Sequence, residues 1–492
     1  MPPEPTSEPD HHRVVIIGAG FGGLGLAHHL RRAGITDVVL LERAASVGGT
    51  WRDNTYPGAQ CDVPATLYSY SFAPNPDWSR NYADGPEIQA YLERCADEFD
   101  LRPAIRLRTE VTSVRWNDTG RHWVLTTTTG PVTASAVVVA TGLLSEPDMA
   151  AVPGLEAFAG DVFHSGAWRH DVDLTGRTVA VVGTGASAIQ FVPAIASGVG
   201  HLTVFQLTPP WIVPRTNPSI SPVRRRVNRR FRIVQRLQRL RTFWQREILA
   251  VAMTRRTGWL ARGEQLARRH LETQVSDPAL RARLTPDYAL GCKRVLLSDD
   301  WYPALQRPNV TLVDTAVDHV DVDGVVDAHG THHDADVLIM GTGFNVTHHP
   351  MFNRITGRHG ATLGEQWAER GMQAHLGTTV SGFPNLFLVT GPNTGVGHTS
   401  MVFMMESQFP YITGALRTLG ERGAVALEIS DTAQAASNAE LAAAMASTVW
   451  TTGNCSSWYL DDHGRNTTLW PATAWAYRRR LRRFDAENYL LY

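Results

Sequence analysis

Two glycine-rich turns, each entered from a run of β-branched residues, constrain the fold of this chain more than any other feature. Residues 14–17 lead into Gly18-Ala19-Gly20-Phe21-Gly22-Gly23, and residues 178–182 lead into Gly183-Thr184-Gly185-Ala186-Ser187-Ala188. An apolar stretch of helical periodicity follows each turn, so each unit is predicted to be a strand, a turn and a helix of a parallel sheet. Two such openings about 165 residues apart predict an α/β fold with two Rossmann-like dinucleotide-binding domains.

The first turn has the residue types that the pyrophosphate of a dinucleotide requires. Gly18 permits the tight turn, Gly20 lets the backbone approach the phosphates, and Gly23 lets the helix pack closely on the strand. The helix N-terminus attracts the anion. Glu42 ends the next predicted strand, 24 residues after Gly18, where an acid accepts hydrogen bonds from ribose hydroxyls. We therefore expect a first nucleotide to bind here.

The second turn differs from the first in two ways. Its third glycine is replaced by Ala188, which the pattern tolerates, and no acid ends the following strand at residues 202–206. An acid there would repel a 2′-phosphate, so its absence favours NADP over NAD. Alternatively, Gln206 simply caps the strand.

The order of predicted elements divides the chain into interleaved segments. Further buried strands are predicted at 38–42, 136–141, 202–206, 337–341 and 386–390, and a helical, Arg-rich stretch replaces them between Pro222 and Pro286. We expect a disordered tail over 1–12, a first nucleotide domain over 13–145 and 384–492, a second over 146–221 and 287–383, and a helical insertion over 222–286.

Composition narrows the function classes. Forty-six basic and 47 acidic residues give a net charge of −1, which excludes a basic nucleic-acid binder. We expect no transmembrane segment, because no apolar run reaches the ~20 residues of a span, and no signal peptide. Cys61, Cys95, Cys292 and Cys455 have no metal-ligand spacing and form no paired framework. We therefore expect no metal site and a cytoplasmic protein in a reducing compartment.

Two longer motifs carry a family resemblance. Gly48-Gly49-Thr50-Trp51, followed by Tyr56-Pro57-Gly58 and Cys61-Asp62, and the series Phe158-x-Gly160-x-x-x-His164-x-x-x-Trp168 resemble the motifs of type I Baeyer–Villiger monooxygenases, class B flavin-dependent enzymes. The resemblance extends from about Arg13 to the C-terminus. Relatives that oxygenate nitrogen or sulfur usually have Phe or Tyr in place of Trp168, whereas Arg169 departs from the usual Pro or Asp.

The resemblance implies a flavin enzyme with two nucleotides. FAD is reduced by NADPH and reacts with O2 to give a flavin C4a-peroxide, which inserts one oxygen next to a ketone carbonyl and yields an ester or lactone. The alternative is oxygenation of sulfur or nitrogen. The expected partner is a small-molecule ketone, and the protein is expected to be a monomer or a small homo-oligomer.

The resemblance also implies the site residues. Asp62 and Arg294 are the expected catalytic pair, because an anionic oxygen species needs a fixed cation and Arg stays charged; the alternatives are a turn residue and a surface cation. Lys293, the only lysine, and Thr208 are expected at the NADPH 2′-phosphate, although Leu207 stands where the family usually has Arg. The full set of expected cofactor contacts is Gly18, Gly20, Phe21, Gly23, Glu42, Gly49, Thr50, Trp51, Asp62, Tyr68, Gly183, Thr184, Gly185, Ser187, Ala188, Thr208, Lys293, Arg294, Asn393 and Trp458.

Several of these positions leave alternatives open. Tyr68 and Trp458 resemble residues that hold the ribose and pyrophosphate of the nicotinamide nucleotide, or they are core aromatics. Asn393 lies in a loop, residues 391–395, that resembles the segment under the flavin ring. His164 is expected to couple the two domains rather than to act as a base.

Residues 224–246 contain ten arginines and no acid, with apolar residues at helical spacing: Val227, Phe231, Val234, Leu237, Leu240 and Trp244. This pattern favours a helix packed over the nucleotide domain with a solvated polar face. A peripheral contact with an anionic membrane is the alternative.

Overall fold

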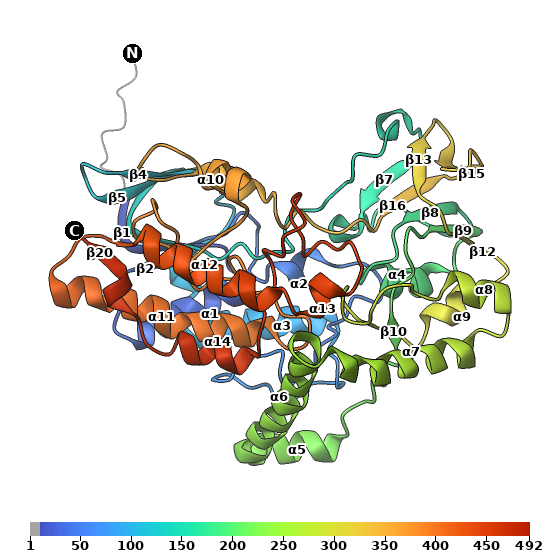
Figure 1. The fold of residues 1–492 in the computed structure, drawn as a ribbon, viewed down its shortest axis with the longest axis horizontal. Helices are drawn as coiled ribbons and strands as arrows, with labels where there is room; N and C mark the ends of the chain where they lie inside the picture. The colour runs from blue at the N-terminus through green and yellow to red at the C-terminus, as the bar shows by residue number, and fades with distance from the viewer. Residues whose placement is uncertain (1–9) are drawn as a thin grey trace.

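The computed structural model describes residues 10–492, and its two largest sheets lie at opposite ends of the molecule (Figure 1). Most of the expected disordered tail lies outside the described residues. Residues 10–12, however, belong to the first strand, so the expectation for these three is wrong. Within residues 10–492, no helix is long and apolar enough to cross a membrane.

The first sheet combines a parallel half and an antiparallel half. Its order is β17-β4-β5-β6-β1-β2-β3, and β18 also pairs with β6. Alternate residues of β1 enter different cores: Val14 and Ile16 pack under helix α1, whereas Val15 and Ile17 pack on the opposite face. Its strands are β1 (Asp10–Ile17), β2 (Val38–Leu41), β3 (Ile105–Arg106), β4 (Val111–Asn117), β5 (His122–Thr127), β6 (Gly130–Val139), β17 (Ile355–Thr356) and β18 (Leu386–Leu388).

The second sheet is fully parallel in the order β12-β9-β8-β16-β7. Every residue of β16 is buried, as expected for a central strand of a parallel sheet. Its strands are β7 (Asp161–His164), β8 (Thr178–Val182), β9 (His201–Phe205), β12 (Val310–Val313) and β16 (Val337–Met340); the smaller pairings involve β10 (Ile212–Val213), β11 (Leu296–Leu297), β13 (Val317–Val320), β14 (Gly324–Asp327), β15 (His332–Asp334), β19 (Leu427–Ile429) and β20 (Tyr489–Leu491).

Helices cover both sheets. The helices are α1 (Phe21–Arg32), α2 (Thr50–Asp53), α3 (Gly85–Glu98), α4 (Ala188–Ile195), α5 (Pro222–Arg230), α6 (Arg232–Thr254), α7 (Ala261–Gln274), α8 (Pro278–Arg283), α9 (Trp301–Leu305), α10 (Leu363–Arg370), α11 (Met401–Arg422), α12 (Asp431–Met445), α13 (Val449–Thr452) and α14 (Ala474–Arg480). The expected two Rossmann-like openings are present: β1 leads into α1, and β8 leads into α4.

The chain returns to the first sheet earlier than residue 384. Strand β17 pairs with β4, and Met351, Ile355 and Leu363 are buried in the core of the first sheet. The boundary expected at 384 is therefore too late. Strand prediction located the buried strand at 386–388 but missed β17, which has only two residues.

The helical insertion packs differently from the expectation. Helix α6 reaches across to the first sheet's side of the molecule, where Gln235 donates to the carbonyl of Asn75 at 2.6 Å and Phe243 stacks on Phe403 at 4.5 Å. The predicted apolar face, with Leu237, Leu240 and Trp244, is exposed.

Candidate active site

A groove at the carboxyl ends of β1 and β2 gathers most of the residues expected to bind the first nucleotide. Its lining includes Gly18, Gly20, Phe21, Glu42, Gly49, Thr50, Trp51 and Tyr68. Ligands of open parallel sheets bind at this edge, because the strand ends and helix N-termini converge there. The groove therefore has the location of a dinucleotide site.

The glycines of the groove have distinct steric roles. Gly18 adopts a φ of +107°, and a Cβ there would lie 2.6 Å from the carbonyl oxygen of Ala140. A Cβ on Gly23 would lie 1.9 Å from the carbonyl oxygen of Gly18, so this glycine permits the close contact of helix and strand. A Cβ on Gly20 would instead have its nearest contact at the Cα of Gly49, 3.7 Å away. The absence of a side chain at Gly20 therefore leaves space that a ligand can occupy and that no other part of the protein fills.

Glu42 is fixed at the floor of this groove. Its side chain accepts hydrogen bonds from the backbone N–H of Ala19 at 2.9 Å and of Ala44 at 3.0 Å. Arg52 forms an ion pair with it at 3.0 Å. Arg52 was missed by the sequence reasoning, although it directly follows the Gly-Gly-Thr-Trp motif. These partners hold the Glu42 carboxylate in one orientation, where ribose hydroxyls can donate to it.

The second glycine turn has the same form on the second sheet. Gly183 adopts a φ of +106°, with its Cβ position 2.5 Å from the carbonyl oxygen of Gly341, whereas the Cβ position of Gly185 is open. Ser187 precedes the first residue of α4, Ala188, and Thr184 donates to the carbonyl of Thr208 at 3.5 Å. The turn and Thr208, which lies just after the end of β9, are therefore close together.

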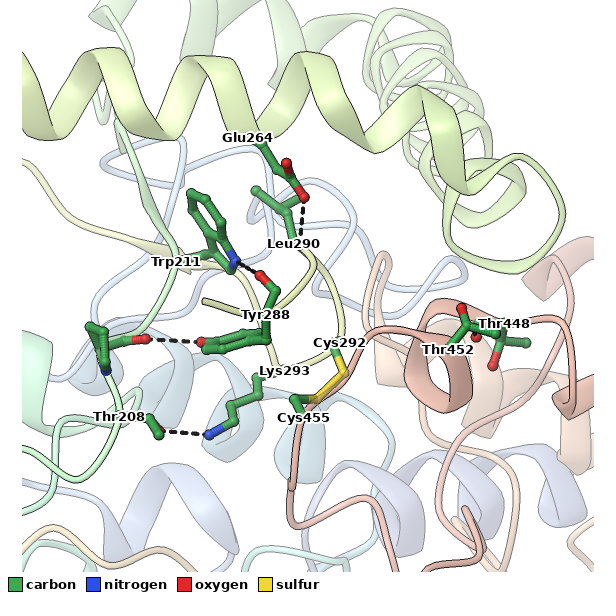
Figure 2. Close-up of a disulfide and its surroundings, with 11 residues drawn as sticks. Thr208, Trp211, Glu264, Tyr288, Leu290, Cys292, Lys293, Thr448, Thr452 and Cys455 are labelled. Atoms are coloured by element: carbon green, nitrogen blue, oxygen red, sulfur yellow. Dashed lines mark hydrogen bonds between the residues drawn. A yellow bond between two sulfur atoms is a disulfide. The ribbon is translucent and has the colours of Figure 1, made fainter. Parts of the chain in front are cut away.

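Lys293 lies next to Thr208 as well, and we call the second glycine turn, Thr208 and Lys293 together the second cluster. Its ammonium donates to the hydroxyl of Thr208 at 2.7 Å and lies 5.0 Å from the centre of the Tyr288 ring (Figure 2). Burial lowers the pKa of Lys293 below its usual value, and Asp287 partly opposes this shift. Leu207, which directly precedes Thr208 and stands where the family usually has Arg, is 75% exposed. Lys293 is thus the one side-chain cation that the structure shows bonded to Thr208.

Asp62 and Arg294 form a two-bond ion pair, as the family resemblance implied. Arg294 Nε lies 2.6 Å from Asp62 Oδ2, and its terminal nitrogen Nη2 lies 2.7 Å from Oδ1. Burial alone would raise the pKa of Asp62, but Arg294 lowers it below the usual value. Asp62 in turn raises the pKa of Arg294. Both groups therefore remain charged over the working pH range.

This ion pair forms part of the wall of a cavity of about 180 Å³. Most of the remaining wall is apolar: Val63, Val213, Leu249, Met253, Leu290, Val295 and Leu297. Arg246 and His398 also line it and were missed by the sequence reasoning. His398 Nε2 lies 3.1 Å from the carboxylate of the buried Glu247. No local sequence pattern could have predicted the contact between His398 and Glu247, because the two residues are far apart in the chain.

A disulfide joins Cys292 to Cys455, with the Cα atoms 6.1 Å apart (Figure 2). The expectation that no cysteines pair is therefore wrong, and the inference of a reducing compartment loses its basis. The bond ties the residue before Lys293 to a segment that contains Trp458, three residues after Cys455. The spacing of 163 residues gave no signal of this pairing. Cys61 and Cys95 are free and buried.

The motif that runs from Phe158 to Trp168 lies at the edge of the second sheet. His164 ends β7, is 2% exposed and accepts from the N–H of Gly166 at 2.9 Å. Its ring packs edge-on against Phe344, at 5.5 Å. Trp168 packs on Phe163 and Phe191. Neither side chain lines the cavity with Arg294.

Tyr68, Asn393 and Trp458, whose roles the sequence left open, have the following surroundings. Tyr68 lines the first groove, where Trp51 donates to its hydroxyl at 3.1 Å, and not the second cluster. The side chain of Asn393 donates to the carbonyls of Asn466 and Leu469 at 3.0 Å, which fixes its loop. Trp458 is 44% exposed.

Comparison with known proteins agrees with this geometry. Residues 15–257 match the family model for pyridine nucleotide-disulphide oxidoreductases. A Baeyer–Villiger monooxygenase of Streptomyces coelicolor is 49% identical over 98% of this chain and 92% of its own length, and one of Pseudomonas aeruginosa is 44% identical over 100% and 94%.

Solved structures give the same result. A steroid monooxygenase bound to NADP superposes with a TM-score of 0.85 at 33% identity, covering 98% of this chain and 99% of that one. OTEMO in complex with FAD and NADP superposes with a TM-score of 0.89 at 27% identity, covering 99% and 100%. The chain therefore belongs to the Baeyer–Villiger monooxygenases, oxidoreductases that use FAD, NADPH and O2 to convert ketones into esters or lactones.

Proposed function

We propose that Asp62 and Arg294 are the catalytic residues of this enzyme, and that its substrate is a ketone with apolar substituents. The observation that carries the proposal is their two-bond ion pair in the wall of a largely apolar cavity. A flat, delocalised cation held by a carboxylate keeps one orientation, so its N–H groups can stabilise negative charge that develops on a reacting oxygen.

The first groove fits FAD. The open space in front of Gly20 and Gly49 would be filled by a side chain at Gly20, and the fixed carboxylate of Glu42 faces the same groove. Thr50, Trp51, Phe21 and Tyr68 would hold the remainder of the flavin. Bound FAD, once reduced by NADPH, supplies the electrons that activate O2 for insertion next to the ketone carbonyl.

The second cluster fits NADPH. The N-terminus of α4 and the turn at Gly183, Thr184, Gly185 and Ser187 would bind the pyrophosphate. Lys293 and Thr208 would bind the 2′-phosphate, since a compact ammonium recognises a phosphate as a point charge. We assign Trp458 to the same coenzyme, because the disulfide ties its segment to the residue before Lys293.

We propose the following division of the chain. The FAD domain comprises residues 10–145 and 346–492, the NADP domain comprises 146–221 and 287–345, and residues 222–286 form the helical insertion. The pairing of β17 with β4 supports the earlier return to the FAD domain. We also propose a cytoplasmic location for a monomer or small homo-oligomer, on the ground that the reaction consumes NADPH; the disulfide does not support that location.

The test is an assay of the purified yellow protein with NADPH and a panel of linear, cyclic, aryl and steroidal ketones. We expect NADPH oxidation to accelerate with a ketone that gives a product one oxygen heavier, identified as an ester or lactone by mass spectrometry. Oxidation of sulfides with no ester from any ketone would contradict the proposed substrate class.

A further inference from the structure

Helix α6 presents a continuous stripe of large apolar side chains to solvent. Ile233, Leu237, Leu240, Trp244 and Ile248 recur at intervals of three and four residues, and each is between 47% and 60% exposed. Trp475 of α14 adds to it, with its ring 6.0 Å from that of Trp244. We call these six residues the α6 stripe. Figure 1 shows α5 and α6 at the lower edge of the molecule, projecting away from both sheets.

The orientation of the stripe is fixed by the opposite face of the same helix. Buried Glu247 accepts from the backbone N–H of Ala474 at 3.1 Å and of Trp475 at 2.9 Å, and it pairs with His398. Gln235 and Phe243 anchor the earlier turns to the body of the protein. The helix cannot rotate to bury the stripe without breaking these contacts. Monomeric soluble proteins rarely expose so many large apolar residues together, so the stripe indicates an interaction surface.

Exposed arginines flank the stripe on α5 and α6. These are Arg224, Arg226, Arg229, Arg230, Arg232, Arg236 and Arg241. Arg229 forms an ion pair with Asp77 at 2.6 Å. The other six form no ion pair within residues 10–492, the part of the chain that the structure describes. The surface therefore combines exposed apolar area with uncompensated positive charge.

This combination identifies the partner. A second copy of the chain in a two-fold contact would bring the same arginines against each other, which is unfavourable. An anionic bilayer provides acyl chains for the stripe and phosphate groups for the arginines, and Trp prefers the boundary between them. We propose that α5 and α6 bind the enzyme peripherally to an anionic membrane surface.

The same helix connects this surface with the catalytic cavity. Leu249 and Met253 line the cavity beside Arg294, and both lie within two turns after Ile248 on the same helix. Membrane-bound enzyme would therefore hold its cavity close to apolar ketones that partition into lipid. This consequence rests on the proposed function, whereas the membrane binding itself does not.

Vesicle flotation tests the membrane binding without reference to activity. We expect the FAD-loaded protein to float with phosphatidylglycerol–phosphatidylcholine vesicles and not with phosphatidylcholine alone, and high salt to weaken the binding. The double variant Leu237→Gln/Leu240→Gln should lose at least tenfold in vesicle affinity. Val322→Gln, which changes a residue of similar exposure (59%) on the β13–β14 turn, should bind like wild type.

A second pair of variants tests how much the arginine charges contribute to vesicle binding. Arg236→Gln/Arg241→Gln should weaken binding about 25-fold, since each charge near such a surface contributes about fivefold, whereas Arg236→Lys/Arg241→Lys should retain it. All four variants should keep wild-type turnover of a water-soluble ketone, which verifies the fold. Absence of flotation by wild type, or flotation unchanged in the Leu237/Leu240 variant, would overturn the proposal. So would a wild-type dimer that this variant converts to a monomer, because the stripe would then be an interface between copies.

Discussion

Arg294 and Asp62 lie 232 positions apart in the chain, yet Nε and Nη2 of the arginine reach both carboxylate oxygens, at 2.6 and 2.7 Å. Asp62 follows the glycine-rich flavin motif, whereas Arg294 follows the lysine expected at NADPH. The ion pair therefore joins two segments that are far apart in the chain, in the wall of one cavity.

Replacing Arg294 should separate flavin reduction from oxygen transfer. Arg294→Ala should retain bound FAD and should still be bleached by NADPH without oxygen. Its ester formation should fall by at least about a hundredfold, the usual cost of removing one donor that stabilises a reacting oxyanion. Anaerobic bleaching and product yield measure the two steps. Asp62→Asn should reduce the yield less, because the cation remains but loses its fixed orientation. Normal ester yield from Arg294→Ala would refute the assignment.

Gly20 and Gly185 provide a clean comparison of the two nucleotide sites. Neither position places a new Cβ within 3.6 Å of the protein, so a valine there blocks mainly the ligand. Gly20→Val should give colourless protein that lacks FAD. Gly185→Val should remain yellow but resist reduction by NADPH. Absorbance spectra and anaerobic mixing measure both effects.

The control for this pair is Gly258→Val, since nothing lies within 4 Å of its Cβ position. It should bind both cofactors. Gly18 is less informative, because its positive φ and its contact with Ala140 would also disturb the fold. Loss of FAD from Gly185→Val alone would reverse the order of the two sites.

The local parts of the structure could be predicted from sequence, and the long-range parts could not. Strand periodicity and glycine turns identified β1 and β8, because both signals lie within a few residues. The Asp62–Arg294 pair could be predicted only from the family resemblance. The Cys292–Cys455 bond was missed because no local pattern connects cysteines 163 positions apart.

Helix α6 shows a second limit of sequence patterns. Its periodicity correctly placed Leu237, Leu240 and Trp244 on one face. Periodicity states which residues share a face, however, and not whether another element covers it. Here the opposite face is buried: Gln235 and Glu247 find backbone partners on other segments, and Phe243 stacks on Phe403.

The disulfide should support coenzyme binding. It joins the residue before Lys293 to the segment of Trp458, so breaking it frees that segment and adds an ordering cost to NADPH binding. Cys455→Ser should raise the NADPH KM by about three- to tenfold, as should a dithiol reductant on wild type. Cys95→Ser, at a buried free cysteine, is the control.

Thiol counting checks the bond itself. Denatured wild type should show two reactive thiols without reductant and all four after reduction. Four thiols without reductant in protein purified under oxidising conditions would contradict the pairing.

Lys293 should decide the preference for NADPH. A hydrogen bond to a charged group is worth about 1.5–3 kcal/mol, so Lys293→Ala should raise the NADPH KM by about ten- to a hundredfold and leave the NADH KM nearly unchanged. Leu207→Arg, which restores the usual family cation at a 75% exposed position, should sharpen the preference. Equal losses with both coenzymes would mean that Lys293 serves another part of the site.

The pH dependence gives an independent test of the same residue. Only the ammonium form of Lys293 binds a phosphate, and burial lowers its pKa below the usual lysine value. As pH rises through that lowered pKa, the charge is lost, so the NADPH KM should rise at less alkaline pH than an exposed lysine would give. The NADH KM should stay flat over the same range. Lys293→Arg should abolish the alkaline rise, because its guanidinium stays protonated. A rise that persists in Lys293→Arg would assign the titration to a different group.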